Sequence, residues 1–244
     1  MKNLNKLVSV VMVAYTEEGH IKKVIEEYYN EIFRNLPEGS EFIIYLDRPT
    51  DNTSNIVNEL AKDIDIKIIE GEKNLGYAGA MTAALKASKN DIVFYSDSSG
   101  KHKAKDFWTL LEYESKYDII TGLRKPVGYS IIRRGITFSQ RILTSVIFFV
   151  PLYDFNTGYK IIHRNIINNV LDECKHTKQS FSTELLVRAY KKGYSVKNVS
   201  VRFSDRQGEN TGTNFRMLPY IMWHSLKGLI KLRIELFGKT KNKF

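Results

Sequence analysis

A short polar segment at residues 97–102 follows directly after an apolar run and reads Asp-Ser-Ser-Gly-Lys-His. A carboxylate at the end of a strand, here Asp97, followed by small residues and a glycine allows a phosphate or a metal ion to approach closely. The same residues also fit a turn in which Asp97 caps the next helix. Which of the two applies depends on the residues that the fold places beside Asp97.

Three more polar segments also come directly after apolar runs of strand length. Ligands of open α/β sheets bind at the carboxyl ends of the strands, so we expect all four segments to meet in one crevice. The four segments are residues 15–18, 47–52, 73–79 and 97–102.

The elements that position these segments are visible in the hydrophobic pattern. Apolar runs alternate with stretches of helical periodicity, which predicts an α/β fold with a mostly parallel central sheet flanked by helices. The expected strands are residues 7–14, 41–46, 65–70, 91–96 and 117–121, and the expected helices are 18–35, 52–63, 77–88 and 105–115.

The second half of the chain is less regular. After a basic stretch at residues 124–141 and a turn at 154–158, we expect three elements and then an apolar, aromatic-bearing helix that ends in a basic tail. These are a strand at residues 159–163, a helix near 181–192, a strand at 195–203, and the final amphipathic helical segment at 217–237.

Composition limits the functional classes. The 244 residues suit one large domain, and the net charge of +10 indicates an anionic partner: nucleic acid, a nucleotide-type substrate or an acidic membrane surface. The single cysteine, Cys174, cannot form an internal disulfide, which favours a reduced, cytosolic setting. The apolar stretch at residues 142–153 is shorter than the roughly 20 residues that span a bilayer, and Pro151 interrupts it.

Taken in order, motifs over about residues 7 to 212 resemble those of the family 2 glycosyltransferases, which have the GT-A fold and transfer a sugar from a nucleotide donor. The segments that carry the resemblance are residues 10–18 (similar to V-I-P-T-Y-N-E-E), 46–53 (D-D-G-S-T-D-N-T), 74–80 (N-x-G-x-x-x-A), 97–102 (D-x-D-G-Q-H), 122–124 (G-S-R), 154–160 (D-x-x-S-G-F-R), 206–210 (R-x-x-G-x-S) and a helix glutamate, Glu184.

Within that family, the late motifs at Arg133, Arg134, Asp154 and Arg206 are most similar to the polyprenyl-phosphate glycosyltransferases, such as dolichyl-phosphate mannose synthase. The resemblance implies a donor site in which the first loop lines the nucleoside pocket and Asp47 accepts hydrogen bonds from the base. The implied donor-binding residues are Ala14, Tyr15, Glu17, Asp47, Asn74, Asp97 and Ser99. Two of these residues have an alternative structural role: Tyr15 could simply be an aromatic residue at the end of a strand, and Asn74 could form a turn.

The chain departs from the family pattern at the metal site. Where D-x-D-x-Q ligates Mg²⁺ or Mn²⁺, this sequence has Asp97, Ser99 and Lys101, and a lysine repels a divalent cation. We therefore expect a weak or absent metal site at Asp97. Lys101 could instead stabilise the negative charge that grows on the departing nucleoside diphosphate. Alternatively, Lys101 points to solvent, or the protein has lost activity.

The acceptor is expected to be a lipid phosphate, because a phosphate is already a nucleophilic anion at neutral pH and needs no general base. The guanidinium groups of Arg124, Arg133, Arg134 and Arg206 are candidates to clamp that phosphate. Asp154 is the best remaining carboxylate and suits either acceptor positioning or a structural turn. The expected catalytic residues are Asp97, Lys101, Asp154 and Arg206.

The sequence thus predicts inverting transfer of a sugar from a nucleotide sugar to a polyprenyl phosphate. We expect a catalytic domain over residues 1–215 and, over residues 216–244, an amphipathic helix and basic tail on the anionic, cytoplasmic face of a membrane. Packing of this helix against the sheet is the alternative. Two other functions stay open: transfer to a sugar hydroxyl in glycan synthesis, and nucleotide-sugar binding without turnover.

Two further classes are disfavoured. A dinucleotide-dependent oxidoreductase would carry G-x-G-x-x-G after the first strand, which is absent from residues 14–18. A nucleic-acid-binding module is disfavoured because Glu17, Asp47 and Asp97 would repel phosphates. The sugar, the base (UDP or GDP) and the oligomeric state stay open.

Overall fold

The computed structural model describes residues 6–124, 141–177, 180–204 and 218–238, with side chains in the last range from Trp223 onward. Its centre is a seven-stranded sheet in the order β3-β2-β1-β4-β6-β5-β7, in which β6 alone runs antiparallel to its neighbours. The mostly parallel α/β architecture expected from the sequence is confirmed. The strands are β1 Val8–Ala14, β2 Glu41–Leu46, β3 Lys67–Glu70, β4 Ile92–Asp97, β5 Ile119–Arg124, β6 Tyr159–His163 and β7 Val196–Val201.

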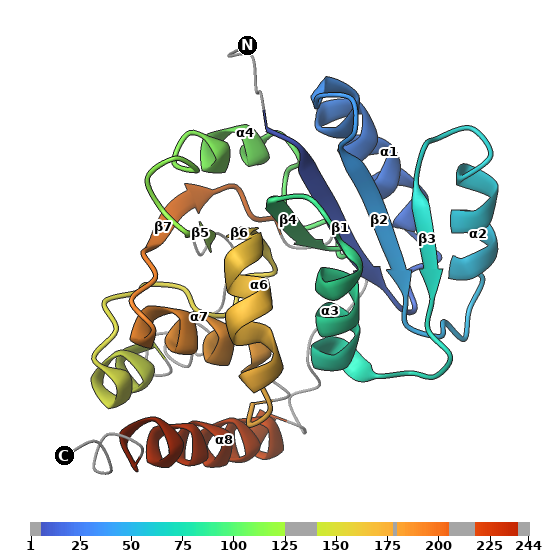
Figure 1. The fold of residues 1–244 in the computed structure, drawn as a ribbon. Coiled ribbons are helices and arrows are strands. Elements are labelled where there is room, and N and C mark those ends of the chain that lie inside the picture. Colours follow the sequence, from blue (N-terminus) through green and yellow to red (C-terminus); the bar gives the residue numbers. More distant parts are fainter. Residues whose placement is uncertain (1–5, 125–140, 178–179, 205–217, 239–244) are drawn as a thin grey trace.

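Helices cover both faces of the sheet (Figure 1). Strands β1, β2 and β4 are buried on both sides, which explains why they appear in the sequence as continuous apolar runs. The helices on one face are α1 Ile21–Glu31, α2 Thr53–Leu60 and α4 Asp106–Leu111; those on the other are α3 Gly76–Ala87, α6 Arg164–Val170, α7 Phe181–Lys191 and α8 Leu218–Gly238.

Some helix boundaries differ from expectation. The helix expected over residues 18–35 ends at Glu31 and is followed by the 3-10 turn Phe33–Asn35. The helix expected over residues 105–115 ends at Leu111, because Tyr113 and Glu114 donate backbone hydrogen bonds three residues back, which tightens the chain into turns. Helix α6 was not predicted, since its seven residues are too few for a clear periodic signal.

The last helix, α8, packs one face into the core. Leu229 and Leu232 are buried among the residues of α6 and α7, and Gly228 lies so close to the loop before α7 that a Cβ there would be 2.6 Å from the carbonyl oxygen of His176. Residues 205–217, where the expected domain boundary falls, lie outside the described ranges. In the part of the chain that the structure describes, no helix is both long and apolar enough to cross a membrane.

Candidate functional site

The loops after β1 and β2 are tied together by hydrogen bonds. The backbone N–H of Glu17 donates to Thr53 Oγ1 at 2.8 Å, and that of Glu18 donates to Asp51 Oδ2 at 3.1 Å. In return, the N–H of Asn52 donates to Glu18 Oε2 at 2.9 Å. These bonds place two of the expected segments side by side at the carboxyl edge of the sheet.

Asp47, directly after β2, connects to the segment before α3. Its carboxylate is buried and accepts a hydrogen bond at 2.7 Å from the backbone N–H of Leu75. The Asn74 side chain donates to the Asp47 carbonyl at 3.1 Å and accepts from the N–H of Gly76 at 3.0 Å. Asn74 therefore shapes the turn, which was one of its two expected roles. In the β2 loop, the residue after Asp47 is Arg48, whose backbone has a positive φ of 57°.

Asp97, at the end of β4, lies against the turn that precedes β6. Its backbone N–H donates to the carbonyl of Gly158 at 2.9 Å, and a Cβ on Gly158 would lie 2.7 Å from Asp97 Oδ2. Only glycine allows this approach. Ser98 donates to Glu17 Oε1 at 3.3 Å, which joins the β4 loop to the β1 loop. The four segments therefore converge as predicted.

The donor set around Asp97 is poor for a divalent cation. The Ser99 hydroxyl donates to Asp97 Oδ1 at 2.5 Å, so it occupies an oxygen that would ligate a metal. Lys101 stands where the family pattern places an amide and supplies no ligand atom in its charged form. Among the residues with described positions, no group of three or more His, Cys, Asp or Glu side chains is placed to hold a metal ion.

Arg124, at the end of β5, forms a bidentate ion pair with Asp154. Its Nε and Nη2 donate to the two carboxylate oxygens at 2.7 and 2.9 Å, and the N–H of Asn156 adds a third bond at 3.1 Å. Burial disfavours the ionised form of Asp154, but the guanidinium outweighs it and lowers the pKa of the carboxyl below its ordinary value. Arg124, expected at the acceptor phosphate, thus fixes Asp154 in place.

Lys160, on β6, is the main site residue that the sequence analysis did not single out. Its side chain is fully buried, and its ammonium donates to the Ser182 hydroxyl of α7 at 2.8 Å. Burial lowers the pKa of Lys160 to about 7, against the attraction of Asp154 and Asp97. The basic residue that ends the D-x-x-S-G-F-R motif was the signal for it.

A buried polar layer surrounds Lys160. Its partners in register on the neighbouring strands are Tyr95 and Thr121, both fully buried. Tyr77 of α3 is 43% exposed as a residue, but its hydroxyl faces those of Tyr95 and Ser182, and burial of that hydroxyl raises its pKa. A layer of buried polar groups therefore lies beneath the loops.

Lys101 and His102 pair with the segment after β7. The carbonyl of Lys101 accepts a hydrogen bond from the N–H of Ser204 at 3.0 Å. The His102 ring is buried and stacks on Tyr159, with ring centroids 4.8 Å apart, and it contacts Phe203 edge to face. Burial lowers the pKa of His102, which favours the neutral form of the ring. These contacts hold the loop at residues 97–102, which includes Lys101, against the segment after β7.

Glu184 of α7 serves the fold. Its buried carboxylate accepts hydrogen bonds from the backbone N–H groups of Lys175, His176 and Thr177 and from the guanidinium of Arg188. These contacts hold the loop before α7 against the helix. Three predicted acceptor-binding arginines, Arg133, Arg134 and Arg206, lie outside the described residues.

Comparison with known proteins supports the resemblance. Residues 9–171 match the family model described as glycosyl transferase family 2. A dolichyl-phosphate β-glucosyltransferase of Trichomonas vaginalis is 24% identical, over 94% of this chain and 71% of the relative. A dolichyl-phosphate hexose transferase of Haloferax volcanii is 25% identical, over 82% of this chain and 84% of the relative.

The fold is similar to that of solved structures. Glucosyl-3-phosphoglycerate synthase of Mycobacterium tuberculosis, in complex with Mn²⁺, UDP and phosphoglyceric acid, superposes with a TM-score of 0.68 at 15% identity, over 94% of this chain and 79% of that chain. The same enzyme with Mn²⁺ and UDP-glucose gives a TM-score of 0.69 at 16% identity, over 93% and 79%. This likeness confirms the expected fold.

Proposed function

Because the chain belongs to glycosyl transferase family 2, we propose that it transfers a sugar, with inversion, from a nucleotide sugar to a polyprenyl phosphate. The observation that carries the proposal is the convergence of the Asp47 and Asp97 loops on one crevice beside the Arg124–Asp154 pair. The two relatives named for transfer to dolichyl phosphate support the choice of acceptor.

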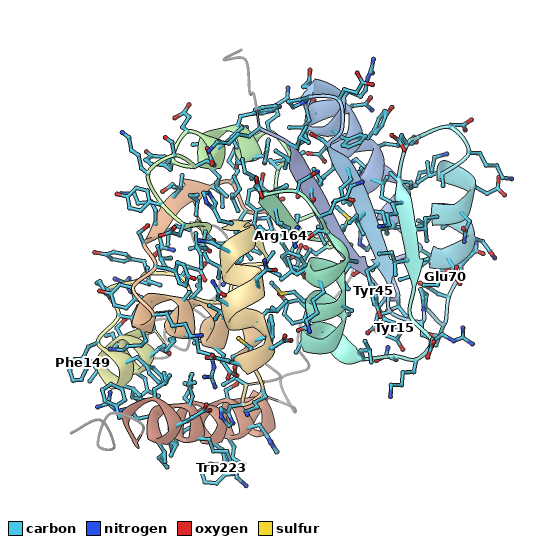
Figure 2. The ribbon with its side chains drawn as sticks, in the orientation of Figure 1. Tyr15, Tyr45, Glu70, Phe149, Arg164 and Trp223 are labelled. Carbon is cyan, nitrogen blue, oxygen red and sulfur yellow. The ribbon has the colours of Figure 1, made fainter. Side chains whose placement is uncertain are left out.

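The donor would lie along the carboxyl ends of β1, β2 and β4. Tyr15, Leu75 and Tyr77 are large residues that stay exposed around these loops, and the two tyrosine rings offer flat surfaces to the base and the ribose. Figure 2 shows Tyr15 at the same end of the sheet as Tyr45, whose hydroxyl lies under the β3 loop. Ala14, Glu17, Asp47 and Asn74 would complete the nucleoside pocket.

In the proposed reaction, a phosphate oxygen of the acceptor attacks the anomeric carbon of the donor sugar. The bond from that carbon to the diphosphate oxygen breaks, and its electron pair leaves with the nucleoside diphosphate, so no proton has to move. Positive charge near the leaving group lowers the barrier. We assign this charge to Lys101 and Arg206 because of their positions in the family motifs, with Asp97 and Ser99 on the diphosphate side.

We further propose that metal dependence is weak or absent. The similar solved enzyme was crystallised with Mn²⁺, but in this chain Ser99 and Lys101 replace two expected ligands and Ser99 already bonds to Asp97. An ammonium in the ligand position repels a divalent cation through simple electrostatics. Lys101 would then perform part of the charge stabilisation that a metal performs in the family.

The state of Asp154 favours a phosphate acceptor over a sugar hydroxyl. A hydroxyl nucleophile needs a general base, whereas Asp154 is held in a bidentate pair and has a lowered pKa. Glu184 is likewise occupied by five hydrogen-bond donors of the fold. A phosphate acceptor needs no such base, and Arg124, Arg133, Arg134 and Arg206 are the arginines that we propose to bind it. With a lipid acceptor, the protein must act at a membrane surface, which we propose is the cytoplasmic face.

A transfer assay tests this function. Purified protein would be given radiolabelled UDP- and GDP-sugars with a short-chain polyprenyl phosphate, in EDTA and again with Mg²⁺ or Mn²⁺. We expect label in the organic phase with at least one donor, and at most a few-fold gain with metal. Label only in water would overturn the transfer proposal, and full dependence on metal would overturn the role of Lys101.

A further inference from the structure

Exposed apolar side chains are concentrated on two elements of the described protein. Eight of the twelve large apolar residues that stay exposed lie on the segment at residues 142–153 or on α8, and most of the others surround the crevice. Scattered single residues of this kind are ordinary, whereas a contiguous group indicates a binding surface. The eight are Ile142, Leu143, Val146, Phe149, Tyr153, Trp223, Ile230 and Ile234.

Arg233 of α8 joins the two elements into one surface. Its guanidinium donates to the carbonyl of Ile147, near the end of the helical residues 141–148. The same group lies over the rings of Phe149, at 5.4 Å, and Phe237, at 3.3 Å. In Figure 2, Phe149 and Trp223 both lie in the lower left part of the molecule, Phe149 at its left edge and Trp223 below α8.

Phe149 is held outward by an unusual backbone conformation. Its backbone φ is +52°, a value that residues other than glycine rarely adopt, and the residue is 67% exposed. Its neighbours Phe148 and Val150 are both buried in the core. The strained turn therefore anchors the chain on both sides of a protruding aromatic ring that contributes little to the core.

Helix α8 presents a mixed apolar and basic stripe on the side away from the core. Trp223, Lys227, Ile230 and Ile234 are exposed at helical spacing, with Lys231 beside them. The opposite side, with Leu229 and Leu232, is buried in the core, as the packing interpretation of this helix expected. Lysines between bulky apolar side chains are typical of helices that lie in the interface of anionic membranes.

The segment at residues 141–153 continues along the chain into the turn that contains Asp154. A mostly apolar hollow of about 250 Å³ lies among Arg141, Val146, Pro151 and Tyr153, and the Arg141 guanidinium is 4.0 Å from the centre of the Tyr153 ring. The next residue along the chain is Asp154.

We propose that residues 141–153 and the exposed stripe of α8 form one docking surface for an anionic phospholipid bilayer, which brings the Asp154 side of the crevice to the lipid. This inference rests on the proposed function, because an enzyme with a lipid acceptor must bind that acceptor at a membrane. The occupant is a bilayer rather than a second protein chain, because Arg141, Lys227 and Lys231 interleave with the apolar groups and the protein carries a charge of +10.

Vesicle flotation tests the surface. The full chain would be mixed with vesicles of phosphatidylcholine alone or with one quarter phosphatidylglycerol, and V146E/F149E and I230E/I234E would be compared with L7E, which changes an exposed leucine elsewhere. We expect binding to the anionic vesicles only, a loss of at least tenfold in both double variants, and a change within twofold for L7E. Circular dichroism of each variant checks that it is folded.

A second readout keeps the surface testable even if one variant is unstable. Brominated lipids quench only tryptophans that enter the bilayer, so quenching in the unchanged protein should disappear in W223F and persist in W108F. Failure of the wild type to bind anionic vesicles, or unaltered binding by both double variants, would overturn the proposal. So would a dimer in light scattering that V146E/F149E dissociates, because the surface would then belong to a second copy.

The same variants separate this inference from the proposed function. With a short-chain, water-soluble polyprenyl phosphate, V146E/F149E should keep the wild-type rate, because no membrane is involved. If vesicles bind as expected but no acceptor is glycosylated, the catalytic proposal fails and the surface stands. If the soluble acceptor is glycosylated but vesicles do not bind, the surface fails and the catalytic proposal stands.

Discussion

The crevice and the α8 surface place their side chains in opposite ways. In the crevice, charged groups such as Asp154, Lys160 and Asp47 are buried, and each is held by hydrogen bonds. On the α8 surface, Phe149 and Trp223 are apolar and exposed. Both placements are unfavourable in isolation. The difference implies that the crevice is organised before its ligand arrives, whereas the surface is completed by its partner.

The comparison predicts that disturbing the crevice affects activity most. In Asp154→Asn, the bidentate pair with Arg124 is lost and the acceptor side of the crevice loses its fixed geometry. We expect the transfer rate to fall on the order of 100-fold, since small displacements of positioning groups have effects of this size. Steady-state kinetics would measure the change.

A matched variant controls for lost stability. Asp106→Asn breaks another ion pair of a buried carboxylate, on α4: the Nε and Nη2 of Arg202, an exposed side chain, both donate to Asp106 Oδ1. Asp154→Asn should lose about 1.5–3 kcal/mol in urea unfolding and Asp106→Asn no more than that, but Asp106→Asn should keep activity within a few-fold. Equal losses of activity in the two variants would mean that Asp154 acts only through stability.

A smaller effect is expected at the glycine beside Asp97. In Gly158→Ala, the new Cβ would lie 2.7 Å from Asp97 Oδ2, so the carboxylate must move. We expect a loss on the order of 10-fold in kcat/KM for the donor, about 1.4 kcal/mol of transition-state stabilisation. Gly238→Ala, where nothing lies within 4 Å, should be unchanged, and an unchanged Gly158→Ala would show that Asp97 tolerates displacement.

Lys160 predicts a pH dependence of stability. Its pKa is about 7 in the folded protein and near 10.5 when unfolded, so the unfolded chain binds more protons between these values. The contribution of Lys160 to the free energy of unfolding therefore rises with pH through this window and is constant below it. Relative to Lys160→Met, the wild type should gain about 1–2 kcal/mol from pH 7 to pH 9.

Urea unfolding at pH 6, 7, 8 and 9 measures this difference. Lys62→Met is the control, because Lys62 is an exposed lysine that pairs with Glu59 on the surface, and its difference from wild type should stay flat. A flat difference for Lys160→Met as well would mean that the buried amine keeps an ordinary pKa.

The smallest effect on stability is expected on the α8 surface. In Phe149→Asn, the left-handed backbone becomes acceptable, while the contact with Arg233 is lost. These changes oppose each other, so the free energy of unfolding should stay within about 1 kcal/mol of wild type. A loss of several kcal/mol in thermal unfolding would show that Phe149 belongs to the core and would remove the contrast between the two regions.

The sequence was sufficient to predict the sheet and the convergence of its loops. The strand runs are apolar on both faces, and the polar segments follow them directly, so Asp47 and Asp97 could be placed at one edge. The pairing of Arg124 with Asp154 was not predictable, because their 30 residues of separation include a stretch without a clear pattern. The sequence therefore assigned Arg124 to the acceptor phosphate without its ion-pair partner.

The burial or exposure of individual side chains could not be predicted from the sequence. Lys160 lies in a strand motif, but its full burial depends on α7 packing over the antiparallel β6, an arrangement that no local pattern predicts. Residues 142–153 were considered only as too short to span a membrane. Their exposure follows from the left-handed turn at Phe149 and from the contact with α8, which are tertiary features.

Acceptor competition tests the central claim most directly. The protein would be given a labelled nucleotide sugar together with a polyprenyl phosphate and the matching polyprenol, which has the same chain and ends in a hydroxyl, in anionic vesicles with EDTA. The account predicts that label enters the phosphate acceptor alone and that the new anomeric bond is inverted. Label in the polyprenol, or in an added oligosaccharide in place of the phosphate, would contradict it.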